Sequence, residues 1–181
     1  MSRLITSLFI IYLGSSSQQA IAVDSVVVFN LINQRLSLMQ DVALYKAVNH
    51  LPIEDIERER VVLASSVENA RDQGLDSASV VDFFATQILV AKAIQYRYRA
   101  DILSDNFAGL HSPVDLNSVI RPQLIRLGGE IVGHMKSYLG NHGAFIQDDR
   151  ELFHSHMLVA YLTGKEKELI FQSLLKITLA E

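Results

Sequence analysis

The chain has 181 residues, no cysteine and a formal net charge of −4 at pH 7. Its length suits one compact domain, and without cysteine that domain can form no disulfide and use no thiol chemistry. A mildly acidic chain lacks the basic surface that nucleic-acid binding requires, so we expect no nucleic-acid partner.

The amino terminus has the three parts of a secretory signal peptide. Arg3 supplies the positive start, residues 4–13 form a short apolar run, and residues 20–22 (Ala-Ile-Ala) form a cleavage site. The apolar run is about half of the roughly 20 residues that cross a bilayer, which favours cleavage over anchoring. We therefore expect a signal peptide over 1–22, a domain over 23–181, and a periplasmic or secreted protein. No later segment is expected to span a membrane.

The mature chain reads as an all-α fold, a single-domain bundle of about six helices. Pro52 ends the first helix, because the residue before a proline is pushed out of the α region. Gly74 is placed to close the second helix and Asp76 to cap the third. Gly128 and Gly129 weaken the fourth and indicate a bend or a close approach of another helix. The predicted helices cover residues 25–49, 53–73, 77–102, 117–140, 145–162 and 165–179.

Two cations interrupt the apolar face of the first predicted helix. Apolar residues recur there at steps of three and four between Val28 and Val42, which is the spacing of one buried face. Arg35 and Lys46 fall on the same series, since their separation brings the helix back to nearly the same bearing. An unpaired buried cation is costly. Each cation must therefore meet either a carboxylate from elsewhere in the fold or an anionic ligand.

Two more polar residues extend this pattern to the second and third helices. Arg58 lies near the start of the second helix, and Gln95 lies on the apolar face of the third. Asp55 and Glu59 are close enough in sequence to neutralise Arg58, but no acidic residue falls on the buried face of the first or third helix. The pattern predicts a cationic pocket for a small anion. A buried network of structural salt bridges is the alternative.

Three stretches at characteristic spacing lie around these polar residues. They are residues 51–59 (LPIEDIERE), 83–88 (FFATQI) and 91–97 (AKAIQYR), preceded by Arg35 and Lys46. Together with the export signal, they resemble the secreted branch of the all-helical, AroQ-type chorismate mutases. The resemblance covers most of the mature chain. It implies an isomerase of aromatic amino-acid biosynthesis that rearranges chorismate to prephenate, built as a homodimer with each active site inside one chain.

The resemblance also gives roles to the residues that match the family's catalytic positions. Arg35 and Arg58 correspond to arginines that hold the substrate's carboxylates. Lys46 corresponds to a lysine that reaches the ether oxygen and a carboxylate, and Gln95 to a residue that donates to the ether oxygen. Arg35, Lys46 and Gln95 are the implied catalytic residues, and Arg58 joins them in binding the substrate.

Five further residues match the family's substrate-binding positions. Asp55 and Glu59 fall where the family anchors the ring hydroxyl, and Arg121 resembles an arginine that this branch supplies from its later half. Ala91 stands where some relatives have Ser or Thr, so one hydrogen bond to a carboxylate is expected to be missing. Val62 is implied as an apolar wall of the same pocket.

The chemistry of this rearrangement suits a cationic pocket. One C–O bond breaks while a C–C bond forms within a single dianionic substrate, with no proton transfer and no nucleophile. An enzyme contributes by selecting the compact conformer and by stabilising the negative charge that grows on the ether oxygen. We therefore expect no cofactor and no metal. His154 and His156 are two residues apart and project to different sides of a helix, which makes them poor metal ligands.

Two other functions stay open on the residues alone. The chain could be a non-catalytic exported helical protein that binds an anionic metabolite or a protein partner. The presence of both Lys46 and Gln95 favours the enzyme, because carboxylate capture alone needs no donors at the ether oxygen. Lyase chemistry on isochorismate is a further possibility, since it too is pericyclic and depends on cations.

Overall fold

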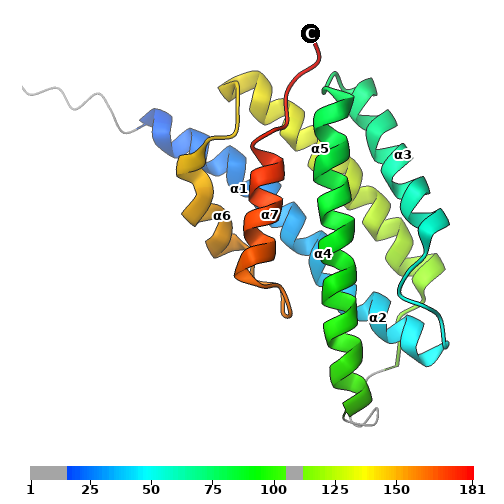
Figure 1. Cartoon of the computed structure of the whole chain (residues 1–181). Helices are drawn as coiled ribbons and strands as arrows, with labels where there is room; N and C mark the ends of the chain where they lie inside the picture. Colours follow the sequence, from blue (N-terminus) through cyan, green and yellow to red (C-terminus); the bar gives the residue numbers. More distant parts are fainter. Residues whose placement is uncertain (1–15, 105–111) are drawn as a thin grey trace, which may run out of the picture.

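The computed structural model describes residues 16–104 and 112–181, with side chains from residue 25 onward, and within these ranges it contains helices and no β-sheet. The prediction of an all-α bundle is confirmed. Figure 1 shows the helices packed side by side, with α4 running along the front of the bundle. The α-helices are α1 (Ser16–Ser37), α2 (Met39–Val48), α3 (Ile56–Asp72), α4 (Ser77–Ser104), α5 (Arg121–His142), α6 (Arg150–His156) and α7 (Gly164–Leu174).

The first predicted helix is two helices that follow one line. α1 ends at Ser37 and α2 begins at Met39, with Leu38 between them at φ −70° and ψ −9°. The Ser37 hydroxyl donates to the Gln34 carbonyl at 2.8 Å, a local bond that competes with the helical ladder. Because Leu38 stays in the α region, the helical phase carries over the break, and α1 and α2 run on in one direction (Figure 1).

The amino-terminal predictions are only partly covered by the structure. Residues 1–15 of the predicted signal peptide lie outside the described residues, and α1 begins at Ser16. Cleavage after Ala22 would therefore remove the first residues of α1. Processing at this position stays a prediction, as does the domain boundary at residue 23. Residues 105–111, between the third and fourth predicted helices, also lie outside the described part.

The caps predicted for the second and third helices form as expected. Asp55 caps α3 by accepting from the Arg58 backbone N–H at 3.1 Å, so this helix begins three residues later than predicted. Gly74 follows α3 at φ +80°, a conformation that glycine adopts without strain. Asp76 accepts from the Ser79 N–H at 2.9 Å and caps α4.

α4 differs from the prediction that no later segment is long and apolar enough to span a membrane. With 28 residues of mostly apolar composition, it is long and apolar enough to span a bilayer, contrary to the sequence-based expectation for the later segments. Its fully buried residues, such as Phe83 and Ile94, pack in the hydrophobic core. α4 contacts α2, α3 and α7, as a central core helix does.

The later half of the chain encloses the bundle from the other side. A π-helical turn, η1 (Leu116–Ile120), leads directly into α5. The predicted close approach occurs at Gly129, where a Cβ atom would lie 3.4 Å from Asn69 Nδ2 of α3. α6 is shorter than the predicted helix over 145–162. The Leu158 N–H bonds the Asn33 side chain at 2.8 Å, which draws the chain out of the helix.

Candidate active site

A cavity of about 430 Å³ lies between α1, α2, α3, α4 and α5. It is lined by the end of α1, the inner faces of α2, α3 and α4, the turn before α3, and the start of α5. All nine residues that the sequence singled out face this one space: Arg35, Lys46, Asp55, Arg58, Glu59, Val62, Ala91, Gln95 and Arg121. The fold brings them together from stretches up to 86 positions apart. Their individual roles stay predictions.

Arg35 is a buried cation held by neutral groups. Its side chain is 6% exposed, and Nη1 donates to Oε1 of Gln87 at 3.0 Å. Its Cζ lies 5.9 Å from the centre of the Phe84 ring, and its Nε has no partner. Burial lowers the pKa of Arg35 to about 10, so the guanidinium is still charged at neutral pH.

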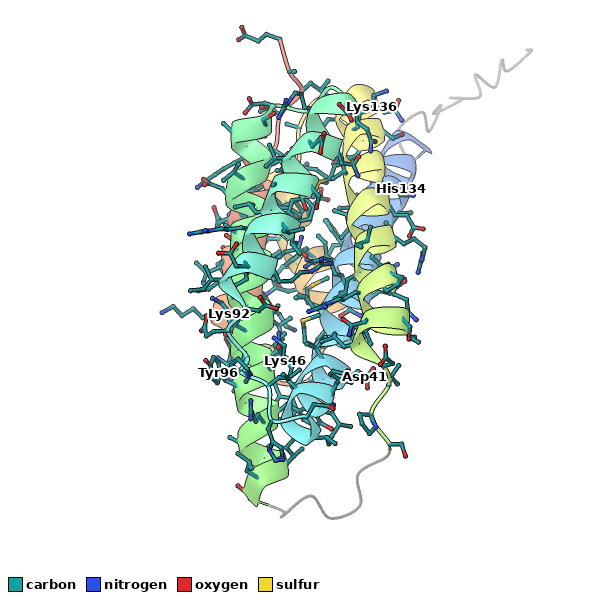
Figure 2. All side chains as sticks on the ribbon, turned by 90° about the vertical axis from the view of Figure 1, so that its right-hand side faces the viewer. Asp41, Lys46, Lys92, Tyr96, His134 and Lys136 are labelled. Atoms are coloured by element: carbon teal, nitrogen blue, oxygen red, sulfur yellow. The ribbon has the colours of Figure 1, made fainter. Side chains whose placement is uncertain are left out.

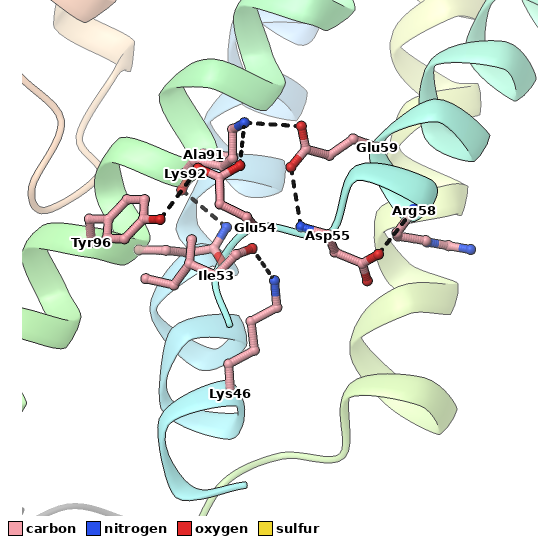
Figure 3. A network of polar contacts seen from close by, with 10 residues as sticks. Lys46, Ile53, Glu54, Asp55, Arg58, Glu59, Ala91, Lys92 and Tyr96 are labelled. Carbon is pink, nitrogen blue, oxygen red and sulfur yellow. Dashed lines mark hydrogen bonds and ion pairs between the residues drawn. The ribbon is translucent and has the colours of Figure 1, made fainter. Parts of the chain in front are cut away.

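Lys46 is the second buried cation. It is 8% exposed, and its Nζ donates to the Ile53 carbonyl at 2.6 Å (Figure 3). Burial is the main cause that lowers its pKa. The charges of Asp55, Glu59 and Glu54 raise that pKa in part, and Arg121 lowers it further. The ammonium is thus partly balanced by the field of carboxylates that do not touch it.

The ion pairs of this region lie at the rim of the cavity. Among the described residues, no ion pair includes Arg35, Lys46 or Arg58. This geometry favours an anion site over the alternative of a buried salt-bridge network, because the buried cations have no carboxylate at contact distance. Arg121 at the rim lies 3.6 Å from a carboxylate oxygen of Asp55 and donates to Asn117.

Gln95 points its amide into the cavity from α4. It is 5% exposed, and its Nε2 donates to the Ala91 carbonyl at 3.1 Å and contacts the Met39 sulfur at 3.5 Å. Its Oε1 has no partner. An amide nitrogen carries two N–H groups, and a sulfur acceptor is weak. One N–H of Gln95 is therefore available to a stronger acceptor in the cavity.

Lys92 is a cavity residue to which sequence reasoning gave no role. Its Nζ lies 3.0 Å from carboxylates of both Glu54 and Glu59, and Tyr96 donates to Glu54 at 3.3 Å. Glu59 in turn accepts from the Asp55 N–H at 3.4 Å. Figure 3 shows this network around the turn before α3, and Figure 2 shows Lys92 and Lys46 in the same part of the bundle. Lys92 precedes Gln95 by three residues, and this helical spacing was the one sign in the sequence that both side chains face the same cavity.

A curated relative from Enterobacter agglomerans, named a monofunctional chorismate mutase, is 39% identical over 146 residues, which are 81% of this chain and 79% of the relative. The chain belongs to the type II chorismate mutase family. The model of that family matches residues 19–96. The secreted chorismate mutase of Yersinia pestis is 40% identical over 143 residues, covering 79% of this chain and 76% of the relative.

The fold agrees with this family assignment. The crystal structure of a secreted chorismate mutase from Yersinia pestis matches with a TM-score of 0.77 and 37% identity, covering 84% of this chain and 97% of that one. Members of the family rearrange chorismate to prephenate. The resemblance found in the sequence is thus confirmed at the level of family and fold.

The remaining walls of the cavity are mostly apolar, and no specific role was predicted for them. The hydroxyls of Ser65 and Ser66 both donate to the Val62 carbonyl within their own helix. In the described residues, no group of three metal-ligating side chains comes together. The donors that the cavity offers to an anion are those of Arg35, Lys46, Arg58, Gln95 and Arg121. The apolar wall residues are Met39, Val42, Ile53, Val61, Phe84, Ile88, Leu116, Leu124 and Ile125.

Proposed function

We propose that this cavity rearranges chorismate to prephenate by holding the compact conformer of the substrate and stabilising charge on its ether oxygen. The observation that carries the proposal is the pair of buried cations, Arg35 and Lys46, without a carboxylate at contact distance. A fold gains nothing from burying two unpaired cations, whereas a dianionic ligand supplies the missing charges.

The carboxylates of the substrate are assigned to the arginines. Arg35 presents its guanidinium from the buried end of the cavity, where a planar fork can bond a carboxylate at two points. Arg58 and Arg121 approach from α3 and the start of α5. The three arginines together fix both carboxylates, which selects the conformer in which the reacting carbons lie close to each other.

The ether oxygen is assigned to Lys46 and Gln95. As the C–O bond breaks, negative charge grows on this oxygen, and an ammonium and an amide N–H stabilise that charge more than they stabilise the ground state. Within one molecule the C–C bond forms as the C–O bond breaks, so no atom is gained or lost. The site needs donors at fixed points and no general base.

The ring hydroxyl is assigned to the turn at the start of α3. Asp55 and Glu59 are already linked, because the Asp55 N–H donates to Glu59. Val62, one helical turn further along α3, supports the ring by apolar contact. Ala91 carries no hydroxyl, so beside the reacting bond α4 offers its backbone and Gln95 as polar groups.

Product analysis of the purified mature protein tests the proposal. Incubated with chorismate, the protein should consume it with formation of prephenate, identified by NMR. A parallel incubation with isochorismate measures the lyase side activity. Binding of chorismate without turnover would support the non-catalytic alternative and contradict the proposed function.

Location and assembly belong to the same proposal. The relative from Yersinia pestis is named a secreted chorismate mutase, and this chain has a signal-like amino terminus, so we propose export to the periplasm or beyond. We further propose a homodimer with no membrane association after cleavage. Light scattering on the exported protein should give twice the mass of the mature chain. The mass of one chain would contradict the dimer.

A further inference from the structure

Gln87 is a buried polar residue that reaches the active site only through Arg35. It lies on α4 with 0% of its side chain exposed, and its Oε1 accepts from Arg35 Nη1 at 3.0 Å. It is absent from the residues that line the cavity. Its amide therefore lies behind the guanidinium, outside the lining of the cavity.

Gln87 is a poor choice for stability at this position. Its Nε2 has no partner, and neither has Nε of Arg35. Leaving a buried donor unsatisfied costs free energy, and an apolar residue would avoid that loss at Nε2, although it would leave Nη1 of Arg35 without its acceptor. The neighbouring buried positions of α4, such as Phe84 and Val90, are indeed apolar. The glutamine therefore serves Arg35 rather than the packing of α4.

We propose that Gln87 is a positioning residue that orients Arg35 for carboxylate capture while leaving its positive charge uncompensated. The inference rests on the proposed function. The Phe84 ring restrains the guanidinium from one side, and the hydrogen bond to Gln87 fixes its rotation. The acceptor has to be neutral. A carboxylate there would form a charge-assisted pair with Arg35 and compensate the positive charge that the substrate's carboxylate needs.

Gln87→Glu changes that neutral acceptor into an anion of the same shape. A like charge about 8 Å from a bound carboxylate, at an effective dielectric constant of about 20, weakens binding about 30-fold. We expect kcat/KM for chorismate to fall by about this factor at neutral pH, mainly through KM. The Kd for prephenate, measured by calorimetry, should rise by the same factor, while the melting temperature holds or increases.

The pH dependence of this variant gives a second readout. Glutamate protonation should restore part of the lost affinity in acid, so the ratio of kcat/KM between variant and wild type should rise as pH falls. The other charged groups facing the cavity are the same in both proteins and cancel in the ratio. They are Lys46, Asp55, Arg58, Glu59, Lys92 and Arg121.

Gln87→Met removes the acceptor without adding charge. Loss of one orienting hydrogen bond is expected to raise KM and the Kd for prephenate about 5-fold. This variant decides the matter if Gln87→Glu does not fold. Gln172→Glu is the matched control, because Gln172 is exposed on α7, away from the cavity. The control should keep the wild-type kcat/KM.

Measuring both kcat/KM for chorismate and Kd for prephenate separates a failure of this inference from a failure of the proposed function. If wild-type protein binds prephenate but does not convert chorismate, the proposed function fails and the Kd values still decide the role of Gln87. The inference is overturned if the folded variants keep kcat/KM and the prephenate Kd within about 2-fold of wild type. It is also overturned if wild-type protein binds neither compound.

Discussion

Replacing Arg35 with methionine tests whether the buried cation serves the ligand or the fold. Burial lowers the Arg35 pKa well below its usual value, to about 10. This difference corresponds to about 3 kcal/mol against the charged form in the folded protein. The folded state holds this proton less tightly than the unfolded chain does. The loss of stability is therefore complete below about pH 10 and disappears as the pH rises from there towards the usual pKa of arginine.

Arg35→Met removes that destabilisation at neutral pH but also removes a hydrogen bond. The Oε1 of Gln87 loses its donor, which costs about 1–3 kcal/mol for a buried group. The two effects nearly cancel, so the free energy of unfolding should stay the same or increase by up to about 2 kcal/mol. Loss of a guanidinium that grips the substrate should lower kcat/KM by at least about 100-fold.

Urea denaturation at pH 7 and initial rates of chorismate consumption measure the two effects separately. Arg126→Met is the matched control, because Arg126 forms an exposed ion pair with Glu130 on α5. Its unfolding free energy should change by less than about 0.5 kcal/mol and its rate should not change. If Arg35→Met lost about 3–5 kcal/mol and kept its rate, Arg35 would be part of a structural pair and our reasoning would be refuted.

Three further predictions follow from the site and from the amino terminus. Gln95→Glu should move the optimum of kcat/KM to acidic pH, since an ionised carboxylate repels the growing oxyanion. Wild-type activity should fall only in alkali, where Lys46 loses its proton, because burial lowers the pKa of Lys46. If the two pH profiles overlap, residue 95 does not face the breaking bond. Lys92→Met should lower kcat/KM about 10-fold because Glu54 and Glu59 lose their cation. Lys92→Arg should restore kcat/KM. Equal rates for Lys92→Met and wild type would contradict this role of Lys92. Mass spectrometry of the exported protein should find an amino terminus at or within a few residues of Val23, and an intact, membrane-bound product would refute the cleavage.

Helical spacing was enough to place most of the site on one side of three helices. Arg35 and Lys46 share the cavity because the step at Leu38 keeps helical dihedrals, so the phase counted along one helix survived its division into two. Gln95 reached the same cavity because α4 is uninterrupted over its length. Helical periodicity places side chains correctly where the backbone stays regular, and the backbone is regular over the residues of α1, α2 and α4 that line the cavity.

The contacts of the site depended on tertiary partners that spacing does not reveal. The hydrogen bond between Gln87 and Arg35 joins residues 52 positions apart, so no spacing within α4 could reveal it. Lys92 contacts two carboxylates only because the turn before α3 brings them to it, and the spacing of α4 does not reveal that turn. Just past the end of α6, the Leu158 N–H likewise bonds Asn33, which is 125 positions away.

The most direct test of the central claim is the kcat/KM for chorismate of Lys46→Met beside that of the wild type. Lys46 is 8% exposed and bonds only the Ile53 carbonyl among the contacts of the described residues. We predict prephenate formation by the wild type and a loss of at least about 100-fold in the variant, with its helical circular dichroism and melting temperature retained. A folded Lys46→Met protein that converts chorismate at the wild-type rate would contradict the account.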